Sequence, residues 1–271
     1  AIICRDEEDR LAACLDSVAW CDEVVVVDSG RTDASVEIAR KRATRVLHNA
    51  WPGWVAQKNF ALDACSGEWV LCLDADERCT PALADAIRAA IARDPAVAGF
   101  AMRRHVFYLG RWIDHGGWYP DWKLRLVRRG RARWGGVDPH DKLLPDGPVD
   151  RLDADLEHFT YRDFADHVRT LQRFSDVVAG EWARAGRRFS LWRAIAHPPV
   201  KFLECWIWKR GFLDGWPGFV IAATSSFYVF AKHVKIWERS AGRFAVATAT
   251  SRNFARNTAT SHVPTEKYPN I

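Results

Sequence analysis

Two carboxylates end an apolar run in the sequence Trp69-Val70-Leu71-Cys72-Leu73-Asp74-Ala75-Asp76-Glu77. A similar run comes earlier in the chain, Val24-Val25-Val26-Val27-Asp28-Ser29-Gly30. Continuous apolar runs of this kind are typical of strands that are buried on both faces of a parallel sheet. Because open α/β sheets bind ligands at the carboxyl ends of their strands, the two runs predict a nucleotide and metal site at one sheet edge.

The Asp-x-Asp triplet alone identifies nothing, since Asp153-Ala154-Asp155 repeats it. The alternation of strand and helix patterns around it carries the argument. We predict strands at 1–4, 23–27, 45–47 and 69–73, and helices at 10–18, 33–41, 55–65 and 81–93. Asp33 or Thr32 is expected to cap the second helix, and Thr80 the fourth, with Pro81 at its first position. This order predicts a doubly wound α/β unit.

The pattern changes twice after this unit. Short aromatic β-like segments follow from Ala98 to His158, and amphipathic helical periodicity follows over 163–185 and 191–235. We therefore expect an α/β domain at 1–160, a helical extension at 161–240 that is a candidate for membrane association, and a mobile tail at 241–271. The helices carry Lys and Arg beside Trp and Phe, so they either lie in a membrane interface or pack on the catalytic domain.

Composition limits the other classes of protein. The longest apolar stretch, Phe219 to Ala231, is shorter than the ~20 residues that span a bilayer. Seven scattered cysteines without a Cys-x-x-Cys pair indicate buried thiols and a cytosolic protein. The chain shows no secretory signal and opens directly on a strand, so we expect its true start upstream. The absence of a Walker loop and of Gly-x-Gly-x-x-Gly argues against nucleotide hydrolases and dinucleotide dehydrogenases.

Cations and aromatic residues are unevenly distributed. The net charge is only +5, yet Lys123 to Arg133 holds six cations and no acid. This segment is either a solvated strand edge or a patch for phosphates, anionic lipid or nucleic acid. Fourteen tryptophans exceed what packing usually requires, and large aromatic side chains with a polar tip suit sugar faces and membrane interfaces.

Four short motifs stand in order along the first half: Arg5-Asp6-Glu7-Glu8, Asp28-Ser29-Gly30-Arg31-Thr32-Asp33, Gln57-Lys58-Asn59 and Asp74-Ala75-Asp76. Together they resemble the inverting nucleotide-sugar glycosyltransferases of family 2, which have the type A nucleotide-binding fold. The resemblance implies a mostly parallel central sheet flanked by helices, followed here by a C-terminal amphipathic helical extension. Two positions depart from the family: Arg31 replaces a frequent Ser, and Asp6 replaces a frequent Asn.

Two later segments extend the resemblance to about Glu238. They are Gly117-Trp118-Tyr119-Pro120-Asp121-Trp122-Lys123-Leu124-Arg125-Leu126 and Lys209-Arg210-Gly211-Phe212-Leu213-Asp214-Gly215. Both are similar to the branch of bacterial lipopolysaccharide core glucosyltransferases that add a sugar to inner-core heptose.

The resemblance assigns donor-binding roles residue by residue. It implies that Asp76 binds a divalent metal, Mn²⁺ or Mg²⁺, because the leaving diphosphate needs its charge neutralised. Asp74 holds either the ribose or the metal through water. Glu7 and Asp28 contact the nucleotide base and ribose. Asp33 supports that pocket, and Lys58 lies near the base or the phosphates.

Inversion also requires a base for the acceptor hydroxyl. Asp121 is our first candidate, because it precedes Leu124-Arg125-Leu126 as the family's catalytic acid precedes its own Leu-Arg element. Asp141 is the second candidate and is alternatively an acceptor ligand. Four further residues are expected to contact the acceptor: Trp118, Tyr119, Arg125 and His140. Trp122 is a further stacking candidate, His115 another ligand for sugar hydroxyls, and His158 a third metal or phosphate contact.

The sequence thus predicts a metal-dependent glycosyltransferase. The expected donor is a UDP-sugar, UDP-glucose first, and the expected acceptor is the lipopolysaccharide inner core. We expect a cytoplasmic enzyme, peripheral to the cytoplasmic face of the inner membrane. The alternatives are transfer to a polyprenyl phosphate or another glycan, and a non-catalytic carbohydrate-binding protein. No nucleic-acid module is recognisable, so nucleic acid is not expected as a partner.

Overall fold

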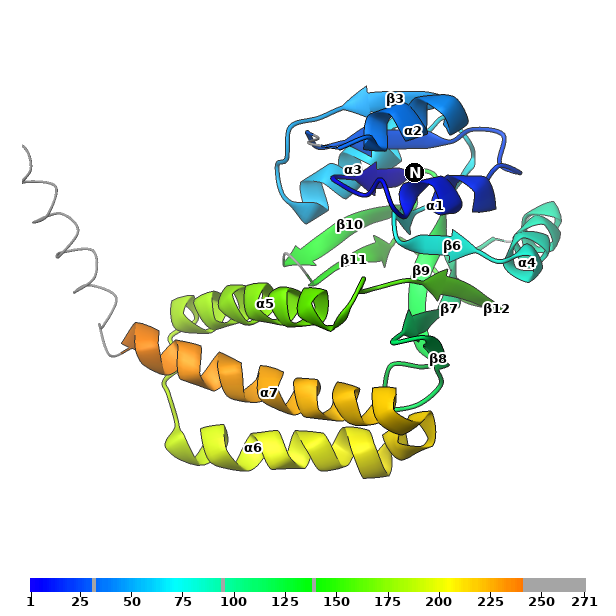
Figure 1. The fold of residues 1–271 in the computed structure, drawn as a ribbon. Coiled ribbons are helices and arrows are strands. Elements are labelled where there is room, and N and C mark those ends of the chain that lie inside the picture. Colours follow the sequence, from blue (N-terminus) through cyan, green and yellow to red (C-terminus); the bar gives the residue numbers. More distant parts are fainter. Residues whose placement is uncertain (31–32, 94–95, 138–139, 241–271) are drawn as a thin grey trace, which may run out of the picture.

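The structure is a computed structural model that describes residues 1–30, 33–93, 96–137 and 140–240. A four-stranded parallel sheet forms its first part (Figure 1). Its order is β3 (Arg45–His48), β2 (Val25–Asp28), β1 (Ile2–Cys4) and β5 (Leu73–Asp74). The connecting helices are α1 (Leu11–Ser17), α2 (Ser35–Arg42) and α3 (Trp54–Ala64). The predicted tail at 241–271 lies outside the described residues.

Alternation along β2 places its side chains in two separate cores. Val26 packs with Leu11, Leu15 and Leu83 on one face. Val25 and Val27 pack on the other face, in the cluster that contains Trp134. Because all three valines are fully buried, the continuous apolar run corresponds to a strand covered on both faces, as predicted.

The strand predicted at 69–73 is divided between two sheets. β4 (Trp69–Leu71) pairs antiparallel with β9 (Asp121–Arg128), whereas β5 pairs parallel with β1. Cys72 lies between them and donates its backbone N–H to the carbonyl of Arg125 at 2.8 Å. Asp74 therefore emerges where the two sheets meet.

The second sheet has the order β4, β9, β7, β12 and β6, with β8 paired to β7. Its further strands are β6 (Glu77–Cys79), β7 (Gly99–Tyr108), β8 (Arg111–Ile113) and β12 (Val149–His158). Most neighbours are antiparallel, and only β7 and β12 run parallel. A separate hairpin consists of β10 (Ala132–Val137) and β11 (His140–Pro145). Two strands of this half have ten residues, longer than the short segments that we expected.

Local signals place the helix starts. Thr80 caps α4 (Pro81–Ala92), since its hydroxyl accepts a hydrogen bond from the Leu83 N–H at 3.1 Å, as predicted. Asp163 caps the next helix, α5 (Phe164–Arg184), in the same way. Ala34, the residue before α2, provides no side-chain cap, but the Asp33 carboxylate accepts the N–H of Ser35, the first residue of the helix, at 2.9 Å, as expected of a capping side chain. Thr32 lies outside the described residues.

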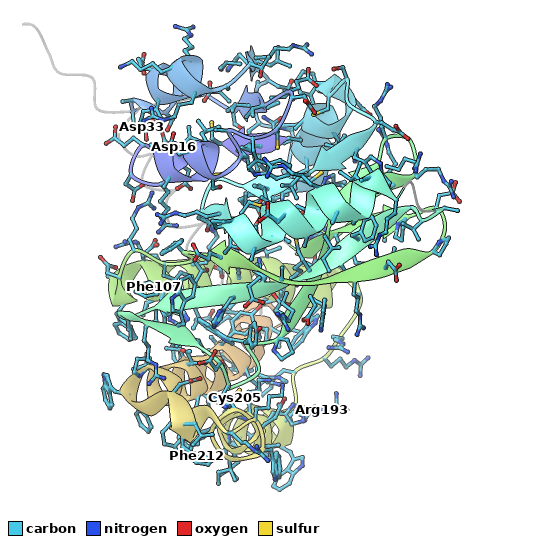
Figure 2. The ribbon with its side chains drawn as sticks, turned by 90° about the vertical axis from the view of Figure 1, so that its right-hand side faces the viewer. Asp16, Asp33, Phe107, Arg193, Cys205 and Phe212 are labelled. Atoms are coloured by element: carbon cyan, nitrogen blue, oxygen red, sulfur yellow. The ribbon has the colours of Figure 1, made fainter. Side chains whose placement is uncertain are left out.

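Three long helices lie on one side of the α/β part, and α7 (Gly215–Ser240) lies between α5 and α6 (Leu191–Leu203) (Figure 1). A π-helical turn at Glu204–Trp208 and a 3₁₀ turn at Gly211–Asp214 join α6 to α7 and interrupt the helical pattern expected over 191–235. In the view of Figure 2, this turn, with Cys205 and Phe212, lies at the opposite end from Asp33. Within the described ranges, no helix combines the length and apolarity needed to cross a membrane.

Candidate donor and acceptor site

The carboxylates predicted to bind the donor meet at the carboxyl edge of the parallel sheet. The register pairs Cys4 with Asp28 on one side of β1 and Ile3 with Asp74 on the other. Glu7 follows β1 itself, and Asp76 follows β5 by two residues. Parallel pairing thus brings together four acids from three separate segments of the sequence.

Asp74 is bound by two cations. Lys58 Nζ lies 2.8 Å from one carboxylate oxygen, and an Arg125 guanidinium nitrogen lies 2.9 Å from the other. Burial alone would raise the pKa of the Asp74 carboxyl, but these two charges hold it well below its usual range. Asp74 is therefore ionised at neutral pH, and both of its oxygens are engaged.

Lys58 is itself enclosed. Its Nζ lies 2.9 Å from Asp141 Oδ2, and 4.4 Å from the centre of the Trp134 ring. Burial opposes the charge, but Asp74 and Asp141 outweigh it and raise the pKa of Lys58 above its ordinary value. Lys58, which was expected near the base or phosphates, is buried between two carboxylates beside the donor edge.

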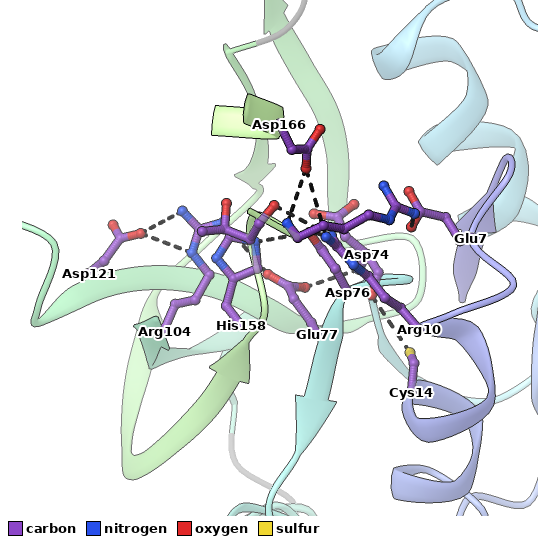
Figure 3. Close-up of polar contacts among 12 residues, drawn as sticks. Glu7, Arg10, Cys14, Asp74, Asp76, Glu77, Arg104, Asp121, His158 and Asp166 are labelled. Atoms are coloured by element: carbon purple, nitrogen blue, oxygen red, sulfur yellow. Dashed lines mark hydrogen bonds and ion pairs between the residues drawn. The ribbon is translucent and has the colours of Figure 1, made fainter. Parts of the chain in front are cut away.

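A chain of ion pairs runs from Asp74 to Asp121 (Figure 3). Arg125 also binds Glu77 at 2.6 Å, and Glu77 is fully buried and accepts the Asp74 N–H at 3.0 Å. Arg104 lies 3.7 Å from Glu77 and donates two hydrogen bonds to Asp121, at 2.8 and 3.0 Å. Asp121 thus lies at the end of a rigid polar chain that begins at the donor site.

Asp76 lies close to Asp74 and contacts His158 (Figure 3). His158 Nε2 is 3.3 Å from its carboxylate, and Arg10 is 3.6 Å away. His158 Nδ1 is buried without a hydrogen-bond partner among the described residues. Burial, and then the charge of Asp76, raise the pKa of Glu7 to about 7, although Arg162 and Arg10 act in the opposite direction.

The donor set beside Asp76 fits a divalent cation that binds with few protein ligands. The described residues contain no cluster of three or more Asp, Glu, His or Cys side chains that would hold a metal by themselves. Asp76 and His158 supply one carboxylate and one imidazole, and diphosphate and water oxygens would complete the shell of Mg²⁺ or Mn²⁺. Asp74 already contacts a cation through each oxygen, so Asp76 is the better placed direct ligand.

A cavity of about 220 Å³ adjoins the end of β2. It is lined by Asp28, Val36, Arg40, Val46, Leu47 and His48. One Asp28 oxygen lies 3.2 Å from His48 Nδ1 and accepts the Gly30 N–H at 3.2 Å, whereas the other oxygen is buried without a partner among the described residues. A buried acceptor without a donor is ready to bind a ligand hydroxyl or N–H.

Hydrogen bonds join the loop after β1 to the loop after β2. Asp33 accepts the Glu8 N–H at 3.0 Å and the Ser35 N–H at 2.9 Å, and so joins the two loops. Asp6, where the family often has Asn, has a φ of 54°. Asn and Asp both tolerate this left-handed conformation, so the exchange preserves the backbone. Arg31, the other departure, lies outside the described residues.

The residues expected to bind the acceptor separate into two environments. The Tyr119 hydroxyl donates to Asp155 at 3.0 Å, and its ring packs 4.5 Å from His105. Trp118 packs inward, 5.5 Å from Tyr108 and 6.2 Å from Tyr161. Tyr119 therefore shares its strand end with Asp121, whereas Trp118 belongs to a small hydrophobic core.

Three other acceptor candidates have different surroundings. Trp122 stacks with the Arg151 guanidinium at 4.7 Å. His115 Nδ1 lies 3.1 Å from Asp214. The side chain of His140 lies outside the described residues. Arg125, which we expected on the acceptor side, is instead 5% exposed and buried under the donor edge between Asp74 and Glu77.

The cationic segment at 123–133 is not an open patch. Its members contact acids or carbonyl oxygens: Lys123 with Asp121, Arg125 with Asp74 and Glu77, Arg128 with Glu68, Arg129 with Gly67, Arg131 with Asp146 and Arg133 with Asp63. The patch reading is therefore corrected, because acids distant in the sequence neutralise most of these charges.

Several residues of the site were not predicted from the sequence. Glu77 directly follows the Asp-x-Asp triplet. It is completely buried and pairs with Arg125 and Arg104. Arg104 lies on β7 opposite Asp121 in the register of the two strands. Arg162, which follows Asp9 by 153 residues in the sequence, binds Asp9 and Glu7 at 2.6 and 3.2 Å. Only Glu77 had a local signal, because the other contacts depend on tertiary pairing.

Comparisons with known proteins agree with this geometry. The model of the family "Glycosyl transferase family 2" matches residues 1–143. The lipopolysaccharide core biosynthesis glycosyltransferase LpsC of Rhizobium meliloti is 30% identical over 247 residues, which cover 89% of this chain and 92% of LpsC. An uncharacterised glycosyltransferase of Rickettsia typhi is 28% identical over 251 residues, 88% of this chain and 86% of that protein.

A solved structure shares the fold. The mannosyltransferase PcManGT of Pyrobaculum calidifontis, solved with GDP-Man and Mn²⁺, superposes with a TM-score of 0.50 at 16% identity. The alignment covers 87% of this chain and 86% of that one. Together with the family match, this likeness confirms the α/β, type A fold that the sequence predicted.

Proposed function

This chain belongs to glycosyl transferase family 2 and is a glycosyltransferase, and on that premise we propose that it transfers glucose from UDP-glucose to a lipopolysaccharide inner-core acceptor. One observation carries the donor half of the proposal, namely the convergence of Asp28, Asp74 and Asp76 at one sheet edge. The name and coverage of LpsC support the acceptor half.

The residues at the sheet edge divide the work of donor binding. Asp28, with a buried oxygen that lacks a partner among the described residues, takes a hydroxyl or N–H of the nucleoside in the adjoining cavity, and Glu7 contacts the nucleotide beside it. Asp33 supports this pocket through the Glu8 and Ser35 N–H groups. Asp74 orients the ribose, directly or through water, because Lys58 and Arg125 hold it charged and fixed.

Asp76 and His158 are the proposed protein ligands of a divalent cation, Mn²⁺ or Mg²⁺. When bound there, the cation would neutralise charge on the leaving nucleoside diphosphate. Arg10 adds a positive charge on the same side, 3.6 Å from Asp76.

Asp121 is the proposed base, and Asp141 the alternative. The Asp121 side chain is 28% exposed, whereas the Asp141 side chain is 7% exposed and faces Lys58. A base must reach the acceptor hydroxyl, so the more accessible carboxylate is favoured. Asp121 would take the proton as the acceptor oxygen attacks the anomeric carbon from the face opposite the leaving diphosphate, which gives inversion.

The proposed division of the chain follows these roles. Residues 1–160 bind the donor and carry out the transfer, and residues 161–240 form the helical extension. Tyr119, Trp118 and His140 are proposed for the acceptor side. We propose that the enzyme works at the cytoplasmic face of the inner membrane, where a lipid-linked core acceptor is presented.

The test is a donor panel with purified protein. UDP-, GDP- and dTDP-sugars would be incubated with Mn²⁺, with Mg²⁺ and with a chelator, and nucleotide release would be measured with and without core oligosaccharide. Metal-dependent release from UDP-glucose, stimulated by the acceptor, is expected. Release from a GDP- or dTDP-sugar alone, or release unchanged by chelator, would refute the donor or the metal assignment.

A further inference from the structure

Exposed apolar side chains are concentrated on the C-terminal helices. The described residues expose twenty large hydrophobic side chains, and fourteen of these lie between Leu191 and Trp237. The α/β part, which contains more than three times as many residues, exposes few by comparison. Such a concentration is unusual for a surface that faces only water.

The exposed residues continue from helix to turn to helix. Trp192 on α6 is 76% exposed, Trp208 in the turn 68% and Trp216 at the start of α7 70%. Ring contacts hold the turn together and join it to α7. The Trp206 ring lies 6.3 Å from that of Phe212 within the turn and 5.6 Å from that of Phe219 on α7. We call the set Trp192, Ile195, Leu203, Trp208, Phe212 and Trp216 the outer face.

The charge of this region is opposite to that of the rest of the described chain. Residues 186–240 hold nine Lys and Arg against three acids, a net charge of +6, whereas residues 1–185 have a net charge of −4. Two of the three acids are engaged within the protein: Asp214 is fully buried, and Glu204 binds Lys201 and Lys209.

Lys235 and Arg239 pair with Asp176 on α5, but two other cations are exposed and neighbour the aromatic residues in the sequence. Arg193 on α6 and Arg210 in the turn are both exposed. Arg193 directly follows Trp192, and Arg210 comes two residues after Trp208. Amphipathic helices with exposed aromatic residues flanked by basic residues lie in the plane of a membrane interface, where the rings enter the headgroup region and the cations meet anionic lipids.

We propose that the outer face docks on the surface of a lipid bilayer that contains anionic headgroups. The identity of the bilayer as the inner membrane rests on the proposed function, but the docking itself rests on exposure and charge. The same charge disfavours a second copy as the occupant, because two surfaces of like sign would repel each other. In Figure 1, α6 is the helix farthest from the α/β part, so this docking leaves the donor edge on the aqueous side.

Vesicle binding of the full chain tests the proposal without donor or acceptor. Co-sedimentation would be measured with phosphatidylcholine vesicles and with vesicles that contain about 30% phosphatidylglycerol, at low and at high salt. Binding to the anionic vesicles at least tenfold tighter than to the neutral ones, and weakened by salt, is expected. Brominated lipids should quench tryptophan fluorescence in the bound state.

The decisive variant replaces Trp192, Trp208 and Trp216 together by Ser. It should lose at least tenfold in vesicle binding and keep the thermal unfolding midpoint, since these side chains are mostly exposed. The matched control replaces Phe60, Leu144 and Val149, which are exposed on the α/β part, and should bind vesicles as the unchanged chain does. Equal binding by both variants would overturn the proposal.

Two further outcomes would also overturn it. One is no binding of the unchanged chain to either vesicle. The other is a concentration-dependent dimer, seen by light scattering, that the tryptophan variant abolishes while vesicle binding stays absent. Failure of sugar transfer would leave the vesicle result untouched, so failure of the docking and failure of the proposed function are distinguishable.

Discussion

Asp214 binds His115 through both the backbone and the ring, although 99 residues separate them. Its carboxylate accepts the His115 N–H at 2.8 Å and lies 3.1 Å from His115 Nδ1. The Gly116 N–H also donates to the Lys209 carbonyl at 2.8 Å. The turn between α6 and α7 therefore fixes the loop that leads into Tyr119 and Asp121.

Replacing Asp214 by Ala should destabilise the protein and reduce transfer together. Removal of the carboxylate leaves the partly buried Asp114 and His115 N–H groups without their acceptor, which costs about 1–3 kcal/mol in the free energy of unfolding. Urea unfolding and kcat would be measured together. Asp85→Ala is the control, because the Asp85 side chain is 78% exposed, and no change is expected there. Normal stability together with normal kcat in Asp214→Ala would show that Asp214 does not fix the loop that leads into Tyr119 and Asp121.

Replacing Arg125 by Met should be among the most damaging single changes to stability. It leaves Glu77 and Asp74 buried with one cation fewer, and breaking a buried ion pair from one side costs about 3–5 kcal/mol. Arg133→Met is the control: the Arg133 side chain is 61% exposed and pairs with the exposed Asp63, so a change below about 1 kcal/mol is expected. Chemical denaturation of both variants provides the comparison, and equal losses would refute the assignment.

Replacing Asp76 by Asn should abolish metal-dependent turnover while the fold persists. The Asp76 side chain is 20% exposed and contacts His158 and Arg10, so the thermal midpoint should fall modestly while the protein still folds. His158→Gln should weaken the apparent affinity for Mn²⁺ by about tenfold or more, because one of two proposed protein ligands is lost. Titration calorimetry with Mn²⁺ in the presence of UDP would measure both. Unchanged metal affinity in both variants would exclude this pair as the ligands.

Asp121→Asn and Asp141→Asn separate the two candidate bases. If Asp121 takes the proton, its variant should lose about 10²–10⁴-fold in kcat with little change in donor KM. Asp141→Asn should instead act on Lys58, which it contacts at 2.9 Å, and raise the donor KM. The reverse pattern in steady-state kinetics would assign the base to Asp141.

His167 gives the protein a specific loss of stability in acid. Its Nδ1 lies 2.7 Å from the Tyr108 hydroxyl, and burial lowers the pKa of His167 to about 4 from an ordinary value of 6.5. The unfolded chain takes up this proton near pH 6.5 and the folded chain only near pH 4. Stability is thus fully present above pH 6.5 and declines as the pH falls toward 4, by about 2 kcal/mol after allowance for solvent screening.

Urea midpoints between pH 7 and pH 4.5 measure this effect. The variant His167→Gln should show a smaller decline over that range, because Gln can still hydrogen bond to Tyr108 but does not titrate. A decline of the same size in both proteins would assign the acid sensitivity to other groups.

The sequence predicted what depends on local patterns and missed what depends on pairing. The buried strand at Val25 to Asp28 and the Thr80 cap follow from neighbouring residues alone. The division of the fourth strand at Cys72 could not be seen, because the residues on both sides are equally apolar and only their partners, Leu126 and Ile2, differ.

In the candidate site too, local patterns predicted some positions, whereas others depend on tertiary pairing. Motif order was enough to bring Asp28, Asp74 and Asp76 to one edge. The position of Arg125 could not be predicted, because alternation along β9 does not say which acids lie beneath it. The pairing of the cations at 123–133 likewise depends on acids from other elements, such as Glu68, Asp63 and Asp146.

The stacked helices α6, α7 and α5 set the distance between α6 and the α/β part. Packed helices lie 8–10 Å apart between axes, so this stack holds the α/β part about 20 Å from the axis of α6. With α6 lying on lipid, the three helices act as a spacer of fixed height. An acceptor would then be selected by how far its reacting sugar stands above the bilayer as well as by its chemistry, and shortening the stack would change which sugar of a lipid-linked chain is extended.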